Sequence, residues 1–388
     1  MNNMRDVYIL GVGSTKFGEL WDSSLRELAS EAGLKAIMDA GVYAEDVDAL
    51  YGANTSGGQF VDQEQIAALI ADYSGITELN IPSIRIEAGS ASGGAALMQA
   101  YLAVKSGQYD TVVVGGVEKM TDVPSEVATE IIGGSLDAEW ETFFGATECS
   151  IAAMIARRHE FEGSAKRSNY AVFPVIAHKH ASMNDTSHFR NVIKIEDVIN
   201  ASTVSDPLTV FDNAPISDGA SALVISADHK KISNAAHPIR IKSSSAANDF
   251  LSLHDRSKID TFKAVRKSTS SALKAANLEI GKIDGIEIHD SYSIASLIQI
   301  EELFGKDAKK MTEGDDFYYN SSNPLNVSGG LKAHGNPLGT SGLYQAVEAT
   351  IQLRGKAGQR QIKDPRNYLI HNMGGLGTTS VSTVIGVD

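Results

Sequence analysis

The segment from Ile84 to Leu97 reads IRIEAGSASGGAAL, and its pattern changes from that of a strand to that of a helix. Apolar and polar residues alternate up to Glu87, as in a half-buried strand, and from Ala96 onward apolar residues recur every three or four positions, as in a helix. The small residues between the two patterns allow a sharp turn and a close approach of another backbone or a ligand. The segment therefore predicts a strand, a tight turn and a helix, with Ser90 in the turn.

Ser90 has two interpretations at this place. Serine at a helix start most often accepts a hydrogen bond from a backbone N–H group, so Ser90 or Ser92 is expected to cap the helix. A reactive side chain at the same place would instead be stabilised by the helix dipole and by the free N–H groups of the first turn. Taken alone, the segment favours the capping role, and the reactive role needs support from the rest of the chain.

Length and composition narrow the class of protein. The chain has 388 residues and is 43% hydrophobic, so it can bury one large core or two fused cores. Its net charge is -14 without a long basic run, which argues against nucleic acid and membranes as partners. Cys149 is the only cysteine, which excludes an internal disulfide and a cysteine-rich metal site. The apolar run from Val7 to Val12 is too short for a signal peptide or a membrane span, so we expect a soluble cytoplasmic protein.

Short apolar runs alternate with helical patterns along the first part of the chain. Strands are predicted at residues 7–12, 47–51, 83–87 and 111–115, and helices at residues 25–40, 63–72 and 92–106. The run from Thr111 to Gly115, TVVVG, is typical of a strand that is covered on both faces. This alternation predicts a layered α/β sheet.

An internal repeat organises the chain. Residues 38–50 match residues 274–286 in pattern without a gap, at an offset of 236 (284 minus 48), and each segment is a helix end, a turn and a strand that opens with aspartate. The same offset places the helix at 25–37 over residues 261–273, and the first strand falls near residues 238–243. A duplicated half explains this agreement better than chance. We therefore predict an N-terminal half at residues 1–235 and a C-terminal half at residues 236–388.

Two further segments complete this frame. The glycine-rich segment at residues 327–342, followed by a helix at 343–354, is the expected counterpart of the Ser90 turn. Residues 120–216, approximately, form an insert in the first half that we expect to cover a ligand. The insert carries aromatic, basic and histidine residues, namely Trp140, Phe143, Phe144, Arg157, Arg158 and the run His178-Lys179-His180.

Six segments, in this order and over essentially the whole chain, resemble the motifs of the thiolase superfamily. The similarity is strongest to archaeal acetyl-CoA acetyltransferases and to sterol-carrier-protein-type thiolases. The segments are EAGSASG at 87–93, GGVEKM at 115–120, PISDGA at 215–220, HDSY at 289–292, NVSGG at 326–330 and HNMGG at 371–375. The resemblance implies a five-layered αβαβα fold with two βαβαβαββ halves, a loop domain over a coenzyme A pocket, and a dimer that pairs strands near Thr111.

The resemblance also carries catalytic positions, and this chain departs from the family at several of them. The family holds the acyl group on a cysteine where this chain has Ser90, and activates that cysteine with the histidine of a Gly-His-Pro motif where this chain has Asn336. Sterol-carrier-type members place an acid–base cysteine where this chain has Ser291. His289, in the oxyanion-binding motif, and His371, in the C-terminal glycine-rich loop, are retained.

The remaining predicted site residues belong to glycine-rich segments. The resemblance implies that backbone N–H groups near Gly374 and Gly375 bind the thioester oxygen. It also implies that Gly329, Gly330 and His334 contact the substrate or coenzyme A, which is a substrate here and not a cofactor.

Cysteine and serine differ in how easily their side chains ionise to become nucleophiles. A cysteine of pKa about 8.5 is largely ionised after a depression of one or two units, whereas a helix end, at roughly 0.3 to 1 kcal/mol, lowers a pKa by less than one unit. Ser90 therefore needs a neighbouring general base. Asn336 has no titratable nitrogen, so the candidates are His334, His289 and His371.

Other candidate groups give weaker signals. We expect His178-Lys179-His180 to be a solvated face and not a metal site, and the glycines of Gly11-Val12-Gly13 lack the rest of a dinucleotide fingerprint. Cys149 lies in an alanine- and isoleucine-rich stretch and is expected to pack in a core. Some basic residues have two interpretations, contact with coenzyme A phosphates or simple solvation: Lys119, Arg157, Arg158 and Lys242.

Two functions of different classes follow. The first is a thiolase-like acyltransferase, of the acetyl-CoA acetyltransferase or 3-ketoacyl-CoA thiolase type, that is weakened by Ser90 and Asn336. The second is a non-catalytic homologue that binds acyl-CoA or serves as a subunit of an acyl-CoA enzyme complex. In both cases we expect acyl-CoA or coenzyme A as ligand, no metal, and a homodimer or homotetramer in lipid metabolism.

Overall fold

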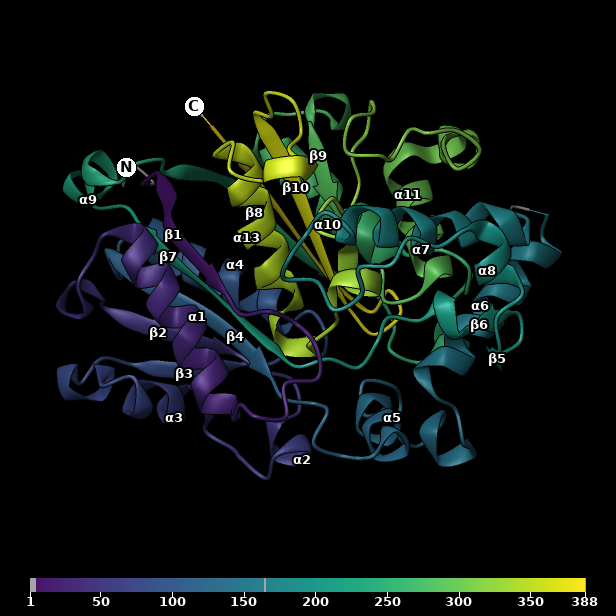
Figure 1. Cartoon of the computed structure of the whole chain (residues 1–388), viewed down its shortest axis with the longest axis horizontal. Coiled ribbons are helices and arrows are strands. Elements are labelled where there is room, and N and C mark those ends of the chain that lie inside the picture. Colours follow the sequence, from purple (N-terminus) through teal and green to yellow (C-terminus); the bar gives the residue numbers. More distant parts are fainter. Residues whose placement is uncertain (1–4, 164, 388) are drawn as a thin grey trace.

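A mixed sheet forms the centre of the computed structural model, which describes residues 5–163 and 165–387 (Figure 1). Within those residues the sheet has nine strands in the order β3-β2-β4-β7-β1-β8-β11-β10-β9. The strands are β1 (Val7–Ser14), β2 (Ala49–Ala53), β3 (Ser83–Ile86), β4 (Thr111–Glu118), β7 (Gly219–Ser226), β8 (Ile239–Asn248), β9 (Gly285–Glu287), β10 (Asn367–Gly374) and β11 (Thr379–Gly386).

The sheet consists of two parts with the same strand order. In the first part β2 and β4 are parallel and β7 and β1 follow antiparallel, and in the second part β9 and β10 are parallel and β11 and β8 follow antiparallel. The two parts join where β1 pairs antiparallel with β8, with Val7 opposite Ile241. Leu325 bridges to Ile286 in parallel, at the place that β3 has beside β2. This repeated order agrees with the predicted duplication.

The repeat extends to the helices and turns. Helix α1 (Leu25–Ala40) has α10 (Lys263–Ala275) as its counterpart, and the 3-10 turns Ala44–Asp46 and Ile280–Lys282 begin 236 residues apart (280 minus 44). The predicted bounds of α1 are confirmed. Ser24 and Glu27 form a capping box that starts the helix, and Gly41, with φ +65°, ends it. The residue bounds of the two halves, 1–235 and 236–388, stay a prediction.

The helices and the two parts of the sheet form the five layers expected of a thiolase fold. Helices α1 and α3 (Ile66–Tyr73) cover the outer face of the first part, and α10, with α11 (Ser293–Phe304) beside it, covers the second part. Helices α4 (Ser92–Ser106) and α13 (Ser341–Leu353) contact each other and strands of both parts, so they form the middle layer (Figure 1). Buried apolar residues fill the spaces between these layers.

The insert at residues 120–216 adds no strand to the large sheet among the residues described. Two of its helices contact α11, and the buried ion pair between Lys119 and Asp218, at 2.8 Å, joins the two ends of the insert. Asp218 also accepts a hydrogen bond from Met120 N. The insert contains α5 (Ser125–Gly133), α6 (Glu148–Phe161), α7 (Arg167–Ala181), α8 (Ile195–Ile199), β5 (Thr203–Ser205) and β6 (Leu208–Thr209); the short helices elsewhere are α2 (Gly57–Phe60), α9 (His229–Asn234) and α12 (Ala308–Met311).

Two sequence interpretations are decided by the sheet. The expected dimer pairing near Thr111 is wrong, because β4 is hydrogen-bonded to β2 on one side and to β7 on the other, so β4 has no free edge. A Cβ atom on Gly11 would lie 2.2 Å from Ala36 O, and one on Gly13 would lie 2.3 Å from Ala32 O. These glycines therefore let α1 pack on β1.

The helices described include none that is long and apolar enough to span a bilayer.

Candidate functional site

The Ser90 turn lies between β3 and α4. The Ser92 hydroxyl donates to Gly89 O at 2.6 Å and accepts from Ala88 N at 2.9 Å, so Ser92 fixes the turn. The N-cap residue is Ala91, whose methyl group makes no capping hydrogen bond. The predicted capping role is therefore wrong for both serines, and the hydroxyl of Ser90 has no hydrogen-bond partner in the described part of the chain.

A pocket of about 290 Å³ opens at this turn. Ser90 is 5% exposed. The Glu87 carboxylate accepts a hydrogen bond at 2.5 Å from the backbone N of Gly89, the residue before Ser90. The insert supplies one wall, through the end of α5 and the loop that follows it. The lining residues are Thr55, Ser56, Gln59, Glu87, Gly89, Ser90, Ile131, Ile132, Gly134, Ser135 and Leu338.

The end of β10 packs against the turn through backbone atoms. A Cβ atom on Gly374 would lie 2.3 Å from Ala88 O, so only glycine fits there. The N atom of Gly375 lies 3.9 Å from the place that a Cβ atom on Gly89 would take. The structure thus brings the two predicted oxyanion glycines beside the Ser90 turn.

Asn372 connects His289 to the same turn. Its side-chain nitrogen Nδ2 lies 3.1 Å from both Ser90 O and His289 Nδ1, while its Oδ1 accepts from Gly94 N at 2.9 Å. Burial and the neighbouring His371 lower the pKa of His289 to about 3, so the ring is neutral at pH 7. Because Asn372 donates to Nδ1, the ring proton lies on Nε2. His289 is therefore a hydrogen-bond donor and a poor base.

His371 is buried and fully engaged away from Ser90. Its Nδ1 lies 2.8 Å from Gln299 Oε1, and its Nε2 lies 2.7 Å from Ser380 Oγ. Burial lowers the pKa of His371 to about 3. With both ring nitrogens occupied, His371 has a structural role in this arrangement and no direct path to the Ser90 hydroxyl.

The glycine-rich segment keeps His334 away from the pocket. His334 is fully buried, stacks on the ring of Tyr344 with centroids 3.7 Å apart, and contacts Thr186 Oγ1 through Nε2 at 3.1 Å. Burial lowers the pKa of His334 well below its ordinary value. Asn336 is 9% exposed and its Oδ1 is buried without a partner among the described residues. The Ser90 hydroxyl has no described hydrogen bond to either side chain.

The other predicted substrate contacts have packing roles. A Cβ atom on Gly329 would lie 2.7 Å from Ala181 Cβ, and one on Gly330 would lie 2.2 Å from a carboxylate oxygen of Asp290. Ser291 is 9% exposed, and its backbone oxygen accepts from Ala214 N at 2.8 Å. Because none of Gly329, Gly330, Ser291 or His334 lines the Ser90 pocket, the structure does not bring these residues to Ser90.

The sequence interpretation missed Ser135 and Glu148. Ser135 lines the pocket and its hydroxyl donates to Glu148 Oε1, while the Tyr292 hydroxyl donates to Glu148 Oε2 at 3.3 Å. Glu148 is 8% exposed, and burial raises its pKa. No sequence signal distinguished it, because an acidic residue in the first turn of a helix is common for its interaction with the helix dipole.

The histidine run of the insert is not a solvated face. His178 and His180 are buried, and their Nδ1 atoms lie 2.8 Å from Asn191 O and 3.1 Å from Asn326 O. Among the described residues no group of three or more His, Cys, Asp or Glu side chains is arranged to hold a metal ion, and the absence of a metal stays a prediction. Burial raises the pKa of the Cys149 thiol to about 11, as expected for a packing residue.

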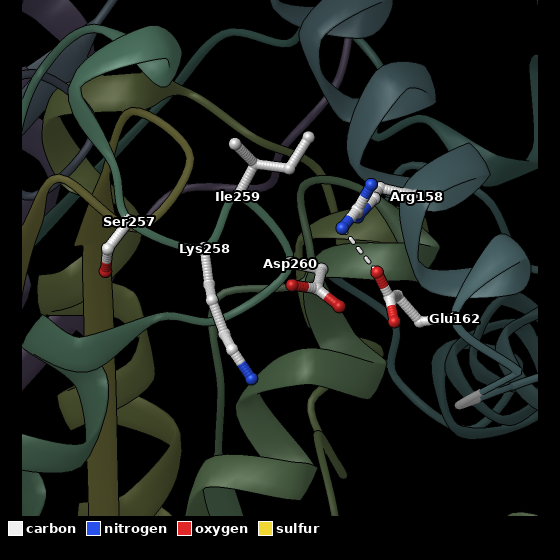
Figure 2. Close-up of a pocket in the computed structure, with 6 residues that line it drawn as sticks. All are labelled: Arg158, Glu162, Ser257, Lys258, Ile259 and Asp260. Atoms are coloured by element: carbon white, nitrogen blue, oxygen red, sulfur yellow. Dashed lines mark ion pairs between the residues drawn. The ribbon is translucent and has the colours of Figure 1, made fainter.

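The basic side chains considered as phosphate contacts have partners within the chain. Lys119 is buried in its pair with Asp218, and Lys242 lies 2.6 Å from Asn367 Oδ1. A separate surface pocket of about 340 Å³ contains Arg158, but Figure 2 shows that Arg158 is paired with Glu162 and that Asp260 lies between this pair and Lys258. Two cations beside two carboxylates do not favour a ligand with several phosphates.

Comparisons with known proteins agree with this architecture. Residues 7–229 match the model of the thiolase N-terminal domain, and residues 245–387 match the model of the thiolase C-terminal domain-like family. The chain is 43% identical over 381 residues to an acetyl-CoA acetyltransferase of Methanothermobacter thermautotrophicus, with 97% of this chain and 98% of the relative covered. It is 29% identical to sterol carrier protein 2 of Gallus gallus, with 98% of this chain and 71% of the relative covered.

Solved structures are similar over the whole chain. The Ltp2-ChsH2(DUF35) aldolase structure has a TM-score of 0.85 and 25% identity, with 99% of this chain and 98% of that chain covered. Human mitochondrial 3-ketoacyl-CoA thiolase, at 17% identity and a TM-score of 0.77 with 99% of each chain covered, shares the fold. Since the two family models together match most of the chain, the chain belongs to the thiolase family.

Proposed function

We propose that the protein binds an acyl-CoA thioester in the Ser90 pocket and acts on it as a slow thiolase-type acyltransferase. The observation that carries the proposal is the contact between the Ser90 turn and the end of β10, where Gly89 and Gly375 N lie together beside a pocket. Backbone N–H groups and the Nε2–H of a neutral His289 are suitable donors to the oxygen of a thioester. Relatives named acetyl-CoA acetyltransferase support this substrate class.

Slow turnover follows from the state of Ser90. A serine hydroxyl needs a base within hydrogen-bond reach to become a nucleophile, and the imidazoles of His289, His334 and His371 bond to other partners. The acyl position is therefore present without the activating group that a cysteine-dependent thiolase uses. Coenzyme A enters this proposal as a substrate.

The test is cleavage of acetoacetyl-CoA with coenzyme A by the unaltered chain. We expect slow turnover and an acetyl group on the peptide that contains Ser90, detected by mass spectrometry after a quench. Ser90→Ala is expected to remove both signals while acetyl-CoA binding persists. Binding of acetyl-CoA without turnover or acetylation would contradict the acyltransferase and leave the second candidate.

The second candidate is a thiolase homologue that works as a subunit of an acyl-CoA enzyme complex. An exposed aromatic surface favours it, because Trp140, Phe143 and Phe144 are 64%, 79% and 72% exposed beside a pocket of about 370 Å³. The Ltp2-ChsH2(DUF35) aldolase structure contains a chain of this fold, and its name gives a second component beside that chain. High activity of Ser90→Cys/Asn336→His, against none in the unaltered chain, would support this candidate, and turnover by the unaltered chain alone would contradict it.

A homodimer or homotetramer in the cytoplasm stays part of the proposal. Strand β3 supports self-association, because it pairs with β2 on one side and its Ile84 side chain is 50% exposed. Light scattering on the purified chain measures the mass directly, and a monomer at micromolar concentration would contradict this part.

A further inference from the structure

Two carboxyl groups lie close to the Ser90 pocket. One belongs to a residue that lines the pocket, and the other is hydrogen-bonded to a lining residue. Glu87 lines the pocket, is exposed to solvent, and is held by Gly89 N. Glu148 is 8% exposed and does not line the pocket, but it accepts a hydrogen bond from Ser135, which does. A carboxylate removed from water is the stronger base, so Glu148 is better suited to accept a proton than Glu87.

The Ser135 hydroxyl is placed to exchange a proton. It has one hydrogen and two acceptors, Ile132 O at 2.8 Å and Glu148 Oε1. When Glu148 is ionised, Ser135 can donate to the carboxylate. When Glu148 is protonated, the carboxyl can donate to the Ser135 oxygen while Ser135 donates to Ile132 O. The hydroxyl can therefore accept a proton from the pocket side and release its own to Glu148 without moving away.

Burial raises the pKa of Glu148 by more than the hydrogen bonds from Ser135 and Tyr292 lower it, so Glu148 is a stronger base than an exposed carboxylate. Tyr292 donates to Oε2, and burial together with the charge of Glu148 raises the pKa of Tyr292, so the phenol stays protonated. The Cys149 thiol is adjacent on α6, and burial raises its pKa to about 11, so it is neutral at pH 7. Asp212, which acts on Cys149, is itself paired with Arg167 at 2.5 Å. No cation is paired with Glu148 in the described part of the chain.

We propose that Glu148 is the acid–base partner of the Ser90 pocket and exchanges protons with a bound acyl-CoA through the Ser135 hydroxyl. The proposal rests on the proposed function, because it requires an acyl thioester in this pocket. Ser135 takes a proton from the carbon next to the thioester carbonyl and passes its own proton to Glu148. The electrons of the broken C–H bond form the enolate, whose charge lies on the thioester oxygen beside Gly375, and the reverse transfer restores the C–H bond.

This step does not need an activated Ser90. The acyl group stays on coenzyme A, and no oxidant or second substrate enters. The consequence is that the protein should exchange the methyl hydrogens of acetyl-CoA with solvent even when acyl transfer is slow. Glu148 would act as a positioning residue for Ser135 and as the store of the proton.

The experiment measures deuterium uptake by acetyl-CoA in heavy water, with NMR spectroscopy, for the full-length chain and four variants. Glu148→Gln and Ser135→Ala are expected to slow exchange by about 100-fold, and Glu148→Asp to restore part of the rate. Glu160→Gln is the matched control, because Glu160 is also on α6 and accepts from the Tyr170 hydroxyl at 2.7 Å, away from the pocket. It should exchange within about twofold of the unaltered chain.

The pH profile and the binding constant distinguish this role from a structural one. Exchange by the unaltered chain should rise with pH through the raised pKa of Glu148, and Glu148→Gln should lose this rise while it binds acetyl-CoA as before. Exchange at the unaltered rate in Glu148→Gln or Ser135→Ala would overturn the inference. Binding without exchange in the unaltered chain would overturn the inference only, whereas absence of acetyl-CoA binding would overturn the proposed function.

Discussion

The two helices of the middle layer begin in different surroundings. Ser90 stands two residues before α4, and Gly339 stands two residues before α13. Ser90 faces a pocket of about 290 Å³, whereas a Cβ atom on Gly339 would lie 2.6 Å from both Asn54 Cα and Glu118 Oε2. The ends of β2 and β4 fill the space beside Gly339, and the insert leaves a gap beside Ser90.

This difference shows how a duplicated fold acquires one site. Both helix starts offer small residues and backbone N–H groups, so local structure alone provides two candidate sites. The insert residues Ile131, Ile132 and Ser135 enclose a space beside Ser90, whereas residues at the ends of β2 and β4 fill the space beside Gly339. The site therefore results from what covers each turn and not from the turn itself.

The contact between the two helix starts should be the most sensitive place in the molecule. A Cβ atom on Gly342 would lie 2.3 Å from Asn372 Oδ1 and 2.5 Å from Gly94 N. Gly342→Ala is expected to lower the free energy of unfolding by about 3 kcal/mol, because packed neighbours must shift. Denaturant unfolding measures the effect. Gly281→Ala, at an exposed glycine with open space around it, is the control, and an equal effect at both positions would contradict this account.

Asn372 should be the next most sensitive residue, because its amide joins both helix starts. Asn372→Ala leaves the buried Gly94 N without its partner and removes one of the two donors to Ser90 O, which keeps the Ser341 hydroxyl at 3.2 Å, so we expect a loss of about 2 kcal/mol in the free energy of unfolding. Asn234→Ala, at the exposed end of α9, is the control and should change the stability by less than about 0.5 kcal/mol. If the two variants unfold at the same denaturant concentration, the amide does not link the halves energetically.

Strand β9 has a buried carboxyl group at a position where its counterpart β2 has none. Glu287 in β9 corresponds to Tyr51 in β2, 236 residues earlier, and burial together with Glu348 raises the pKa of Glu287 to about 8. The folded chain therefore holds this proton over a pH range in which the unfolded chain has released it. Its stabilising contribution is complete below pH 4.5, approximately, and is lost as pH rises through about 8.

Glu287→Gln should remove that dependence. Between pH 5 and pH 8 we expect the free energy of unfolding of the unaltered chain to fall relative to the variant by about 1 kcal/mol per pH unit. Unfolding in denaturant at several pH values measures the difference. Tyr51→Phe is the control, because burial raises the pKa of Tyr51 and it does not titrate in this range. Parallel curves for the unaltered chain and Glu287→Gln would refute the assignment.

The smallest expected effect concerns a difference between α1 and α10, which are counterparts in the repeat. Gly33 in α1 has open space around it, whereas Thr269, at the same place in α10, bonds to Ser382 Oγ at 2.9 Å. Gly33→Ala should raise the free energy of unfolding by about 0.5 to 1 kcal/mol, because alanine favours a helix interior. Gly41→Ala also meets open space but has φ +65°, so it should lower stability. Thermal unfolding of both variants checks the opposite signs.

Local patterns in the sequence were sufficient for much of the fold. The bounds of α1 and α4 were predicted to the residue, and the repeat at an offset of 236 predicted the shared strand order. These features depend on side-chain period, capping residues and glycine, which act within a few residues of the chain. The family and the place of Ser90 in a turn follow from the same local signals.

Contacts between distant segments decided the rest. The Ser90 hydroxyl has no partner among the described residues, His334 is packed on Tyr344, and Ser135 connects Glu148 to the pocket wall, although none of these facts is visible in a local pattern. Burial and hydrogen-bond partners depend on which surfaces meet when the two halves and the insert pack, and those surfaces come from residues far apart in the chain. The sequence by itself therefore determined where the candidate site is expected, and only the tertiary structure decided which groups around it are available for chemistry.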